Sequence, residues 1–312
     1  MSRIVVIGAG AMGLAAAHRA VSLGHEVDLI ESDAVAGGMA AHFDFGGLSI
    51  ERFYHFVCKS DEPTFALMRE LGIADRMKWR GTSMGYFMKG RIHPWGDPIS
   101  LLRFPHLSLL AKFRTGLQMF LTTKARDFSK IENKTARQWL EQGSGKEVYG
   151  TLWRRLLELK FYELADDISA SWIATRVRRI GNSRRSIFQE ELGYIDGGSQ
   201  VLVDALVDAY TEKGGRLHLG EAADRVECHD GKVTGVRTKE RFFPADAVIS
   251  TLPTPLVSRL VPDLPEASKK KYDDIRNIGV VCLLFKLKKS ISRHFWINIV
   301  DATIELPGLI EF

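Results

Sequence analysis

The sequence predicts an α/β protein in which a parallel-sheet domain is combined with a mixed α+β domain that contains a large helical insertion. Residues 3–31 follow the order strand, glycine turn, helix, strand, and residues 194–252 return to the same α/β character. Residues 61–190, by contrast, show helical periodicity and hold five of the six tryptophans. The 312 residues leave room for about two domains.

The N-terminal elements follow from local pattern. Residues 4–7 are continuously apolar, which is typical of a strand covered on both faces. Residues 8–13 form a glycine-rich turn and residues 14–23 a helix, and Gly24 stands where a C-cap glycine belongs. Residues 27–30 form the second strand, which ends at Glu31.

The remaining elements are assigned in chain order. Within the helical insertion we expect helices from 61 to about 72, over 107–121, from 135, and over 148–164. After it we expect a helix over 200–213, a strand over 216–219, a hairpin of 223–228 with 232–238, and a strand over 245–250. Residues 278–287 and 295–300 are expected to be strands of a second sheet.

Composition excludes several classes of protein. The cysteines Cys58, Cys228 and Cys282 are scattered and form no CxxC motif, so neither a disulfide framework nor a metal site is expected. No apolar run approaches the ~18 residues that span a bilayer, and the N-terminus lacks the pattern of a signal peptide. These features predict a cytoplasmic protein.

The charge is unevenly distributed. The net charge is 43 − 38 = +5, and residues 101–130 alone hold six Lys or Arg against one acid, Asp127. Such a window could face an anionic membrane, an acidic substrate or nucleic acid, or could simply be solvated.

The glycine turn has the GxGxxG spacing of a dinucleotide site, with a strand before it, a helix after it and an acid 18 residues past Gly13. Gly8 permits the tight turn, Gly10 lets the backbone approach a pyrophosphate, and Gly13 lets the helix pack on the strand. The helix N-terminus favours the phosphates. Glu31 can accept hydrogen bonds from ribose hydroxyls and would repel a 2′-phosphate, which argues against NADP. The first domain is therefore predicted to be an FAD/NAD(P)-binding Rossmann-like domain.

A second glycine pair separates FAD from NAD. Gly37 and Gly38 follow Glu31 by six and seven residues, which suggests another close backbone approach to the same ligand. Simple nicotinamide dehydrogenases have no common need for this pair, so FAD is the expected cofactor.

At these residues the chain resembles the flavin-containing amine oxidase superfamily, which includes monoamine oxidases, protoporphyrinogen oxidase, carotenoid desaturases and, more distantly, UDP-galactopyranose mutase. The resemblance covers the fingerprint over residues 5–38, the segment 194–198, residues 223–226 and the strand 247–253. It implies that the backbone of Val226 touches the adenine and that Thr251 returns to the cofactor. The cofactor-binding residues expected from motif and resemblance are Gly8, Gly10, Ala11, Met12, Gly13, Glu31, Gly37, Gly38, Met39, Val226 and Thr251.

Two departures from the family pattern matter. Members often carry arginine after the glycine pair, where this chain has Met39, so a bidentate contact to the pyrophosphate is missing. Members also end with a Gly-Asp segment and a helix that close the flavin site, whereas this chain stops at 307–312. We expect the chain to be a fragment of a longer polypeptide.

The resemblance also places candidates beside the flavin ring. The segment 50–56 follows an expected hairpin around 46–47, and the matching family segment lies beside the isoalloxazine. His55 is therefore the first candidate for a residue near the ring, with a core histidine as the alternative. Arg52 is the second, as a partner of a carboxylate or phosphate.

Residues 101–121 mix apolar and basic side chains and predict either a peripheral membrane contact or a lid over the site. The arginines at 178–179 and 184–185 could bind an anionic substrate or be solvated.

The sequence thus predicts an FAD-dependent oxidoreductase that moves a hydride from a C–N or C–C bond of a lipophilic or anionic small molecule to flavin. The expected FAD domain comprises 1–60 and 191–255, and the expected substrate domain 61–190 and 256–312. The alternatives are a flavin-dependent mutase of the UDP-galactopyranose mutase type and a truncated, non-catalytic FAD-binding fragment. No nucleic-acid partner is expected, and the location is cytoplasmic or peripheral at a membrane.

Overall fold

A computed structural model describes residues 1–311, and the chain divides into two compact units. Unit 1 comprises Met1–His55, Pro63–Lys78 and Tyr194–Cys282. Unit 2 comprises Phe56–Glu62, Trp79–Gly193 and the chain from Leu283 onward. Each unit contains both helices and strands, which confirms the predicted α/β class.

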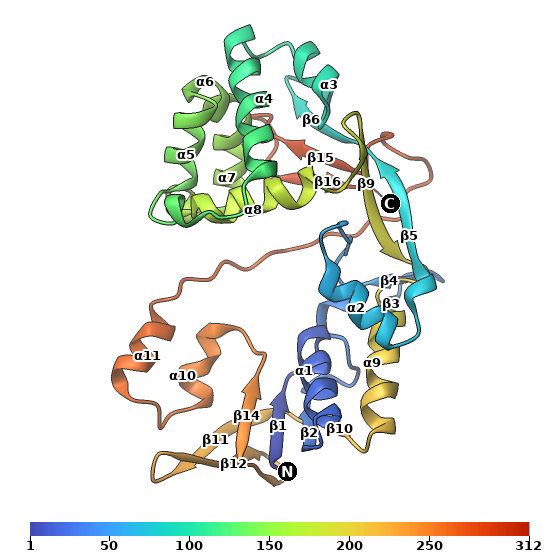
Figure 1. Cartoon of the computed structure of the whole chain (residues 1–312), viewed down its shortest axis with the longest axis vertical. Helices are drawn as coiled ribbons and strands as arrows, with labels where there is room; N and C mark the ends of the chain where they lie inside the picture. The colour runs from blue at the N-terminus through green and yellow to red at the C-terminus, as the bar shows by residue number, and fades with distance from the viewer. Residues whose placement is uncertain (312) are drawn as a thin grey trace. The chain divides into compact units, whose positions relative to one another are not determined.

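A four-stranded parallel sheet forms the centre of unit 1, in the order β10-β2-β1-β14 (Figure 1). Helices α1 and α9 pack together on one face of it, and the β11–β13 sheet packs on the other. Val5 and Val6 point to opposite faces and both are fully buried, which is why the first strand is apolar throughout. The bounds are β1 Arg3–Ile7, α1 Ala11–Ser22, β2 Glu26–Ile30, α9 Gln200–Glu212, β10 Arg216–His218, β11 Ala223–His229, β12 Lys232–Thr238, β13 Phe242–Pro244 and β14 Ala247–Ser250.

Smaller elements complete unit 1. The expected hairpin around Gly46 is present as β3 and β4, and the hairpin of β11 with β12 turns at Asp230 as predicted. Their bounds, with those of the flanking helices, are β3 His42–Asp44, β4 Ser49–Glu51, α2 Glu62–Glu70, α10 Val257–Leu260 and α11 Glu266–Asp273.

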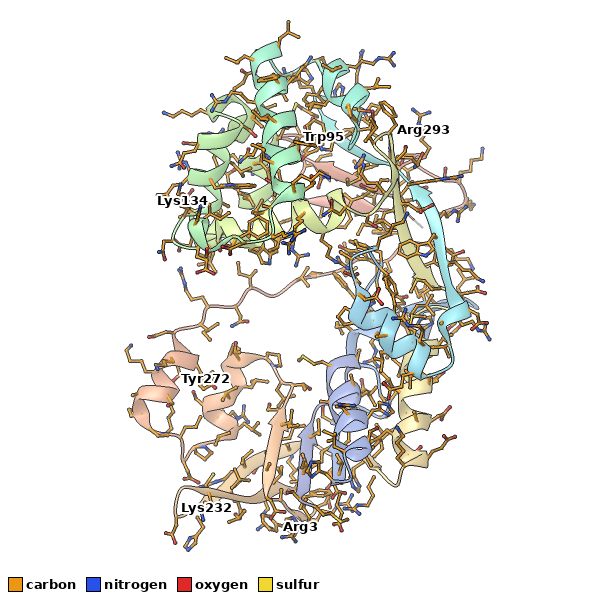
Figure 2. The ribbon with its side chains drawn as sticks, viewed as in Figure 1. Arg3, Trp95, Lys134, Lys232, Tyr272 and Arg293 are labelled. Carbon is orange, nitrogen blue, oxygen red and sulfur yellow. The ribbon has the colours of Figure 1, made fainter. Side chains whose placement is uncertain are left out.

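Unit 2 is built on a four-stranded sheet of order β16-β15-β6-β7, in which β15 runs parallel to β6. Trp95, which is labelled in Figure 2, lies at the end of β7. Its ring packs edge-on against those of Tyr86 and Phe104. A separate three-stranded sheet has the order β5-β9-β8. The bounds are β5 Met77–Thr82, β6 Met84–Met88, β7 Arg91–Trp95, β8 Arg184–Ser186, β9 Gln189–Ile195, β15 Trp296–Ile299 and β16 Gly308–Ile310.

The helices of unit 2 surround a second apolar core that includes Leu140, Leu157 and Ile173. Helix α5 begins with a capping box between Thr135 and Gln138. The expected helix over 148–164 is broken: a π-helical turn spans Tyr149–Trp153 and a 3-10 turn follows Phe161. The bounds are α3 Pro98–Arg103, α4 Leu109–Lys124, α5 Ala136–Gly143, α6 Lys146–Val148, α7 Arg154–Phe161 and α8 Ala170–Gly181.

Of the expectations for secondary structure, one is incomplete and one is wrong. Residues 61–190 are mostly helical, as predicted, but strands β5–β8 and the start of β9 also fall within them and were not predicted. The buried residues Tyr86 and Met88, two positions apart, are the alternating pattern that indicates a strand there. The strand expected over 278–287 is absent: within the described chain, residues 275–295 join no strand ladder, and Val281 is 87% exposed. An apolar run becomes a strand only when it finds a hydrogen-bonding neighbour.

The unit bounds also differ from the expected domain bounds. Most of α2 lies in unit 1 rather than in the substrate region, because Leu67 and Leu71 pack against the core formed with α1 and α9. Residues 256–282 likewise belong to unit 1, where Leu260 packs in the core beneath β11.

Candidate functional site

The glycine turn after β1 is held by close backbone packing. Gly8 has φ +95°, and a Cβ there would lie 2.7 Å from the hydroxyl oxygen of Thr251. A Cβ on Gly13 would lie 1.8 Å from the carbonyl oxygen of Gly8. Any side chain at either position would therefore displace the turn from the start of α1.

Gly10 differs from its two neighbours in the motif, because a Cβ there would meet nothing within 4 Å. Gly10 is the N-cap of α1, no side chain caps this helix end, and no acid occupies its first turn. Unpaired N–H groups of the first turn therefore face open space, where the helix dipole favours an anion. This arrangement fits the pyrophosphate of a dinucleotide.

Glu31 lies beside this opening at the end of β2. Its Oε2 accepts a hydrogen bond from the Ala9 N–H at 2.7 Å, and its Oε1 accepts one from the Asp33 N–H at 2.8 Å and one from the Ser32 hydroxyl at 3.1 Å. The carboxylate thus joins the loop after β1 to the loop after β2, at the carboxyl edge of the sheet where dinucleotides bind.

The second glycine pair lies directly against the first loop. The Gly37 N–H donates to the Ala9 carbonyl at 2.7 Å, and Gly10 and Gly37 form a parallel bridge. A Cβ on Gly38 would lie 3.1 Å from the Cα of Gly10. The structure therefore brings the two glycine motifs together, and the Met39 side chain beside them is exposed. We call residues 8–13, 31 and 37–39 the dinucleotide cradle.

Of the other two expected cofactor residues, Thr251 contacts this cradle and Val226 packs in the neighbouring core. The Thr251 hydroxyl donates to the carbonyls of Ile7, at 3.0 Å, and Gly8, at 3.2 Å, so it braces the turn. The Val226 side chain is 2% exposed and packs in the core with Val5, which leaves only its backbone for any ligand contact.

Arg52 and His55 both pair with carboxylates of unit 1. Arg52 Nη1 lies 2.5 Å from Asp33 Oδ2, and this pairing lowers the pKa of Asp33. His55 Nδ1 lies 2.8 Å from Glu51 Oε2, with the imidazole partly exposed. Arg52 is thereby joined through Asp33 to the cradle, whereas the role of His55 beside a flavin ring stays a prediction.

Glu51 is a residue that the sequence did not single out. Burial raises its pKa, but the hydrogen bonds from His55 and from the Ser199 N–H outweigh burial and leave the pKa below its usual value. The carboxylate therefore joins β4 to the start of α9. Its only sequence signal was its place four residues before a histidine.

The arginine cluster at 178–185 is engaged within unit 2. Arg179 forms a two-point ion pair with Asp61, at 2.9 and 2.5 Å. Arg178 donates to the carbonyls of Ala125 and Arg126, and Arg184 donates to backbone carbonyls. These three side chains hold loops together, whereas Arg185 is exposed, and an anionic substrate at this cluster stays a prediction.

Among residues 1–311, no helix is both long enough and apolar enough to cross a bilayer. The same residues contain no group of three or more His, Cys, Asp or Glu side chains that could hold a metal ion.

Comparison with known proteins gives the family. The family model described as flavin containing amine oxidoreductase matches residues 13–304. Phytoene dehydrogenase of Streptomyces griseus is 26% identical over 315 residues, which cover 85% of this chain and 57% of that protein. Zeta-carotene desaturase of Zea mays is 25% identical over 295 residues, covering 83% of this chain and 51% of that protein. The chain thus spans little more than half the length of these two relatives.

A solved structure has the same fold. An oxidoreductase from Methanosarcina mazei superposes with a TM-score of 0.65 at 20% identity, covering 87% of this chain and 64% of that one. The family match begins within the dinucleotide cradle and continues through both units. This chain therefore belongs to the flavin-containing amine oxidoreductase family.

Proposed function

We propose that the chain binds FAD in the dinucleotide cradle and acts as, or as part of, an oxidoreductase. This enzyme would remove a hydride from a C–N or C–C bond of a lipophilic small molecule. One observation carries the cofactor assignment: the open space at Gly10, in front of the uncapped N-terminus of α1. When bound, FAD supplies the hydride acceptor. The substrate class is supported by the carotenoid-converting relatives that the chain matches.

Each part of the cradle has a distinct task in this proposal. The N–H groups of Ala11, Met12 and Gly13 would bind the pyrophosphate, and the Glu31 carboxylate would bind the ribose hydroxyls. Gly37, Gly38 and Met39 would close the loop over the phosphates, with the backbone of Val226 at the adenine. Thr251 would keep the turn in shape, and Arg52 would fix Asp33 beside Glu31.

The visible spectrum of the purified chain tests the proposal. The two absorption bands of oxidised flavin are expected after incubation with FAD and gel filtration. Anaerobic bleaching by carotenoids or amines would then name the substrate class. A nucleotide-sugar that is isomerised only by the reduced protein would favour the mutase, and a chain that retains flavin but oxidises nothing would be the non-catalytic fragment. Protein that stays colourless would contradict the assignment.

We further propose that helix α4 docks on an anionic lipid bilayer, which would locate the protein peripherally at the cytoplasmic face of a membrane. The buried side of α4 is small or polar, whereas its outer side is Leu and Phe. The buried residues are Ala111, Thr115, Gln118 and Thr122, and the outer residues are Leu109, Leu110, Phe113, Leu117, Phe120 and Leu121, which are 46–79% exposed.

The polar side chains on the inward side of α4 all find hydrogen-bond acceptors within the protein, so this side is stable when buried. The Thr115 and Thr122 hydroxyls donate to carbonyls one turn earlier, and Gln118 donates to the Trp139 carbonyl. A contiguous apolar side of this size is unusual on a protein that meets only water. Residues 101–130, which include α4, hold six Lys or Arg against one acid, and this positive charge matches anionic headgroups.

A further inference from the structure

Two cationic side chains of unit 2 each lie over an aromatic ring, and Phe161 links the two contacts because it follows Lys160 in the chain and packs on Trp172. Lys160 Nζ, near the end of α7, lies 5.3 Å from the ring centroid of Trp296 in β15. Arg176 Cζ, in α8, lies 4.4 Å from the ring centroid of Trp172, and Phe161 meets the same indole edge-on at 5.5 Å. The cluster thus joins the neighbouring helices α7 and α8 to strand β15, which is distant from them in the sequence.

Neither cation has an acidic partner among residues 1–311. The contrast with Lys59 is instructive: its ammonium lies 5.7 Å from the Trp79 ring but also pairs with Glu191 at 2.7 Å. Surface cations are commonly left to water, whereas Lys160 is largely withdrawn from it.

The environment of Lys160 is unfavourable for its charge. Burial and, secondarily, the positive charge of Arg176 lower the pKa of Lys160 to about 8. Tyr162, two residues on, adopts φ +48° with its side chain largely exposed, a strained conformation for a non-glycine residue. An anion between the two cations would relieve both the repulsion and the loss of hydration.

We propose that Lys160 and Arg176 form a recognition site for the carboxylate of a flat, apolar acid, whose body contacts the aromatic side chains around them. Lysine and arginine supply charge-assisted hydrogen bonds to the carboxylate oxygens. Trp296, Trp172 and Phe161 supply apolar contact for an aromatic or unsaturated body. The site does not depend on the proposed flavin chemistry, because it is defined by binding alone.

Binding of trans-cinnamate by the full chain, measured by titration calorimetry, tests this inference. Cinnamamide is the matched uncharged ligand, and it should bind about tenfold more weakly because it lacks the charged acceptor. Lys160→Met and Arg176→Gln should each weaken cinnamate binding by a similar factor. Lys124→Met is the control, since the Lys124 ammonium also lies over a ring, 5.9 Å from Phe120, but outside this cluster.

A second readout separates a direct role from a structural one. In protein labelled with ¹³C at the lysine ε-carbon, cinnamate should raise the pKa of the Lys160 amine, because a bound anion favours its charged form. If Lys160→Met fails to fold, the exposed Arg176→Gln variant carries the test. Equal binding of cinnamate and cinnamamide, or unchanged binding in the variants, would overturn the site. Inorganic phosphate binding as tightly as cinnamate would overturn the carboxylate class.

Discussion

The three glycines of the first motif have different reasons to be glycine. Gly8 and Gly13 are fixed by the protein itself, because a Cβ at either would collide with the hydroxyl of Thr251 or the carbonyl of Gly8. Gly10 has no such neighbour and a φ of −66°, so the folded protein could accept a side chain at this position. Its lack of a Cβ is therefore explained by a ligand and not by packing.

This difference predicts the result of Gly10→Val. The variant should fold with the thermal stability of the wild type within about 0.5 kcal/mol, as for other substitutions into open space. It should nevertheless lose flavin binding, because the branched side chain occupies the place of the pyrophosphate. Flavin retention after gel filtration is the measurement, and Gly279→Val is the control, because Gly279 also has nothing within 4 Å of a Cβ. Full flavin retention in Gly10→Val would contradict the proposal that FAD binds in the dinucleotide cradle.

The opposite result is expected for Gly13→Ala. The new Cβ would lie 1.8 Å from the Gly8 carbonyl oxygen, so the turn and α1 must separate. A loss of about 1–3 kcal/mol in the free energy of unfolding is expected, as for overpacking elsewhere. Urea denaturation followed by circular dichroism measures it. An unchanged midpoint would mean that the loop relaxes without cost.

At the scale of single elements, α8 is tied to the chain before α2 by the ion pair of Arg179 with Asp61. Burial raises the pKa of Asp61, but the hydrogen bonds from Arg179 and from the Cys58 N–H lower it further than burial raises it. The folded pKa therefore lies below the unfolded value of about 3.9. The stability that this pair contributes is present above that unfolded pKa and is lost as pH falls through the folded pKa.

Asp61→Asn should remove this part of the acid sensitivity. At neutral pH the variant should lose about 2 kcal/mol, the magnitude of hydrogen bonds to a charged group. Once the pH falls below the folded pKa of this carboxyl, the two proteins should approach the same stability, since the wild-type carboxyl is then protonated as well. Denaturation midpoints across this pH range measure the difference. A constant difference at every pH would show that the ion pair does not titrate with folding.

Helix α4 has its own prediction. Phe113 and Leu117 project into solvent, so changing both to Glu should leave the fold intact while removing about 2 kcal/mol of transfer free energy for each side chain. In flotation assays the wild type should bind phosphatidylcholine vesicles that contain phosphatidylglycerol, and the double variant should not. Ile187→Glu, an exposed apolar site elsewhere in unit 2, is the control. Wild-type protein that ignores vesicles but dimerises through α4 would show that a second copy covers this side.

At the scale of the whole molecule, cofactor binding is coupled to folding. A ligand that binds only the native state stabilises it, by about 2.7 kcal/mol at a free concentration of a hundred times its Kd. Adding FAD should therefore raise the melting temperature of the wild type in a concentration-dependent way. The same additions of FAD should leave the melting temperature of Gly10→Val unchanged. A shift in that variant would place FAD outside the dinucleotide cradle.

The sequence by itself determined the class of fold, the glycine motifs, Glu31 and the family, because each depends on residues that are close in the chain and on strict spacing. It did not determine the strands β5–β9, since short sheet strands depend on neighbours contributed from distant segments. For the same reason it assigned a strand to 278–287, a run that is apolar but unpaired among the described residues.

Only the tertiary structure decided which side of α4 faces solvent, which carboxylates hold Arg52 and Arg179, and that Lys160 has no carboxylate partner among the described residues. Local sequence specifies what a side chain can do, through its charge, size and backbone freedom. What it does depends on the groups that folding brings beside it from far along the chain. Lys160 and Trp296, 136 positions apart, are the clearest case.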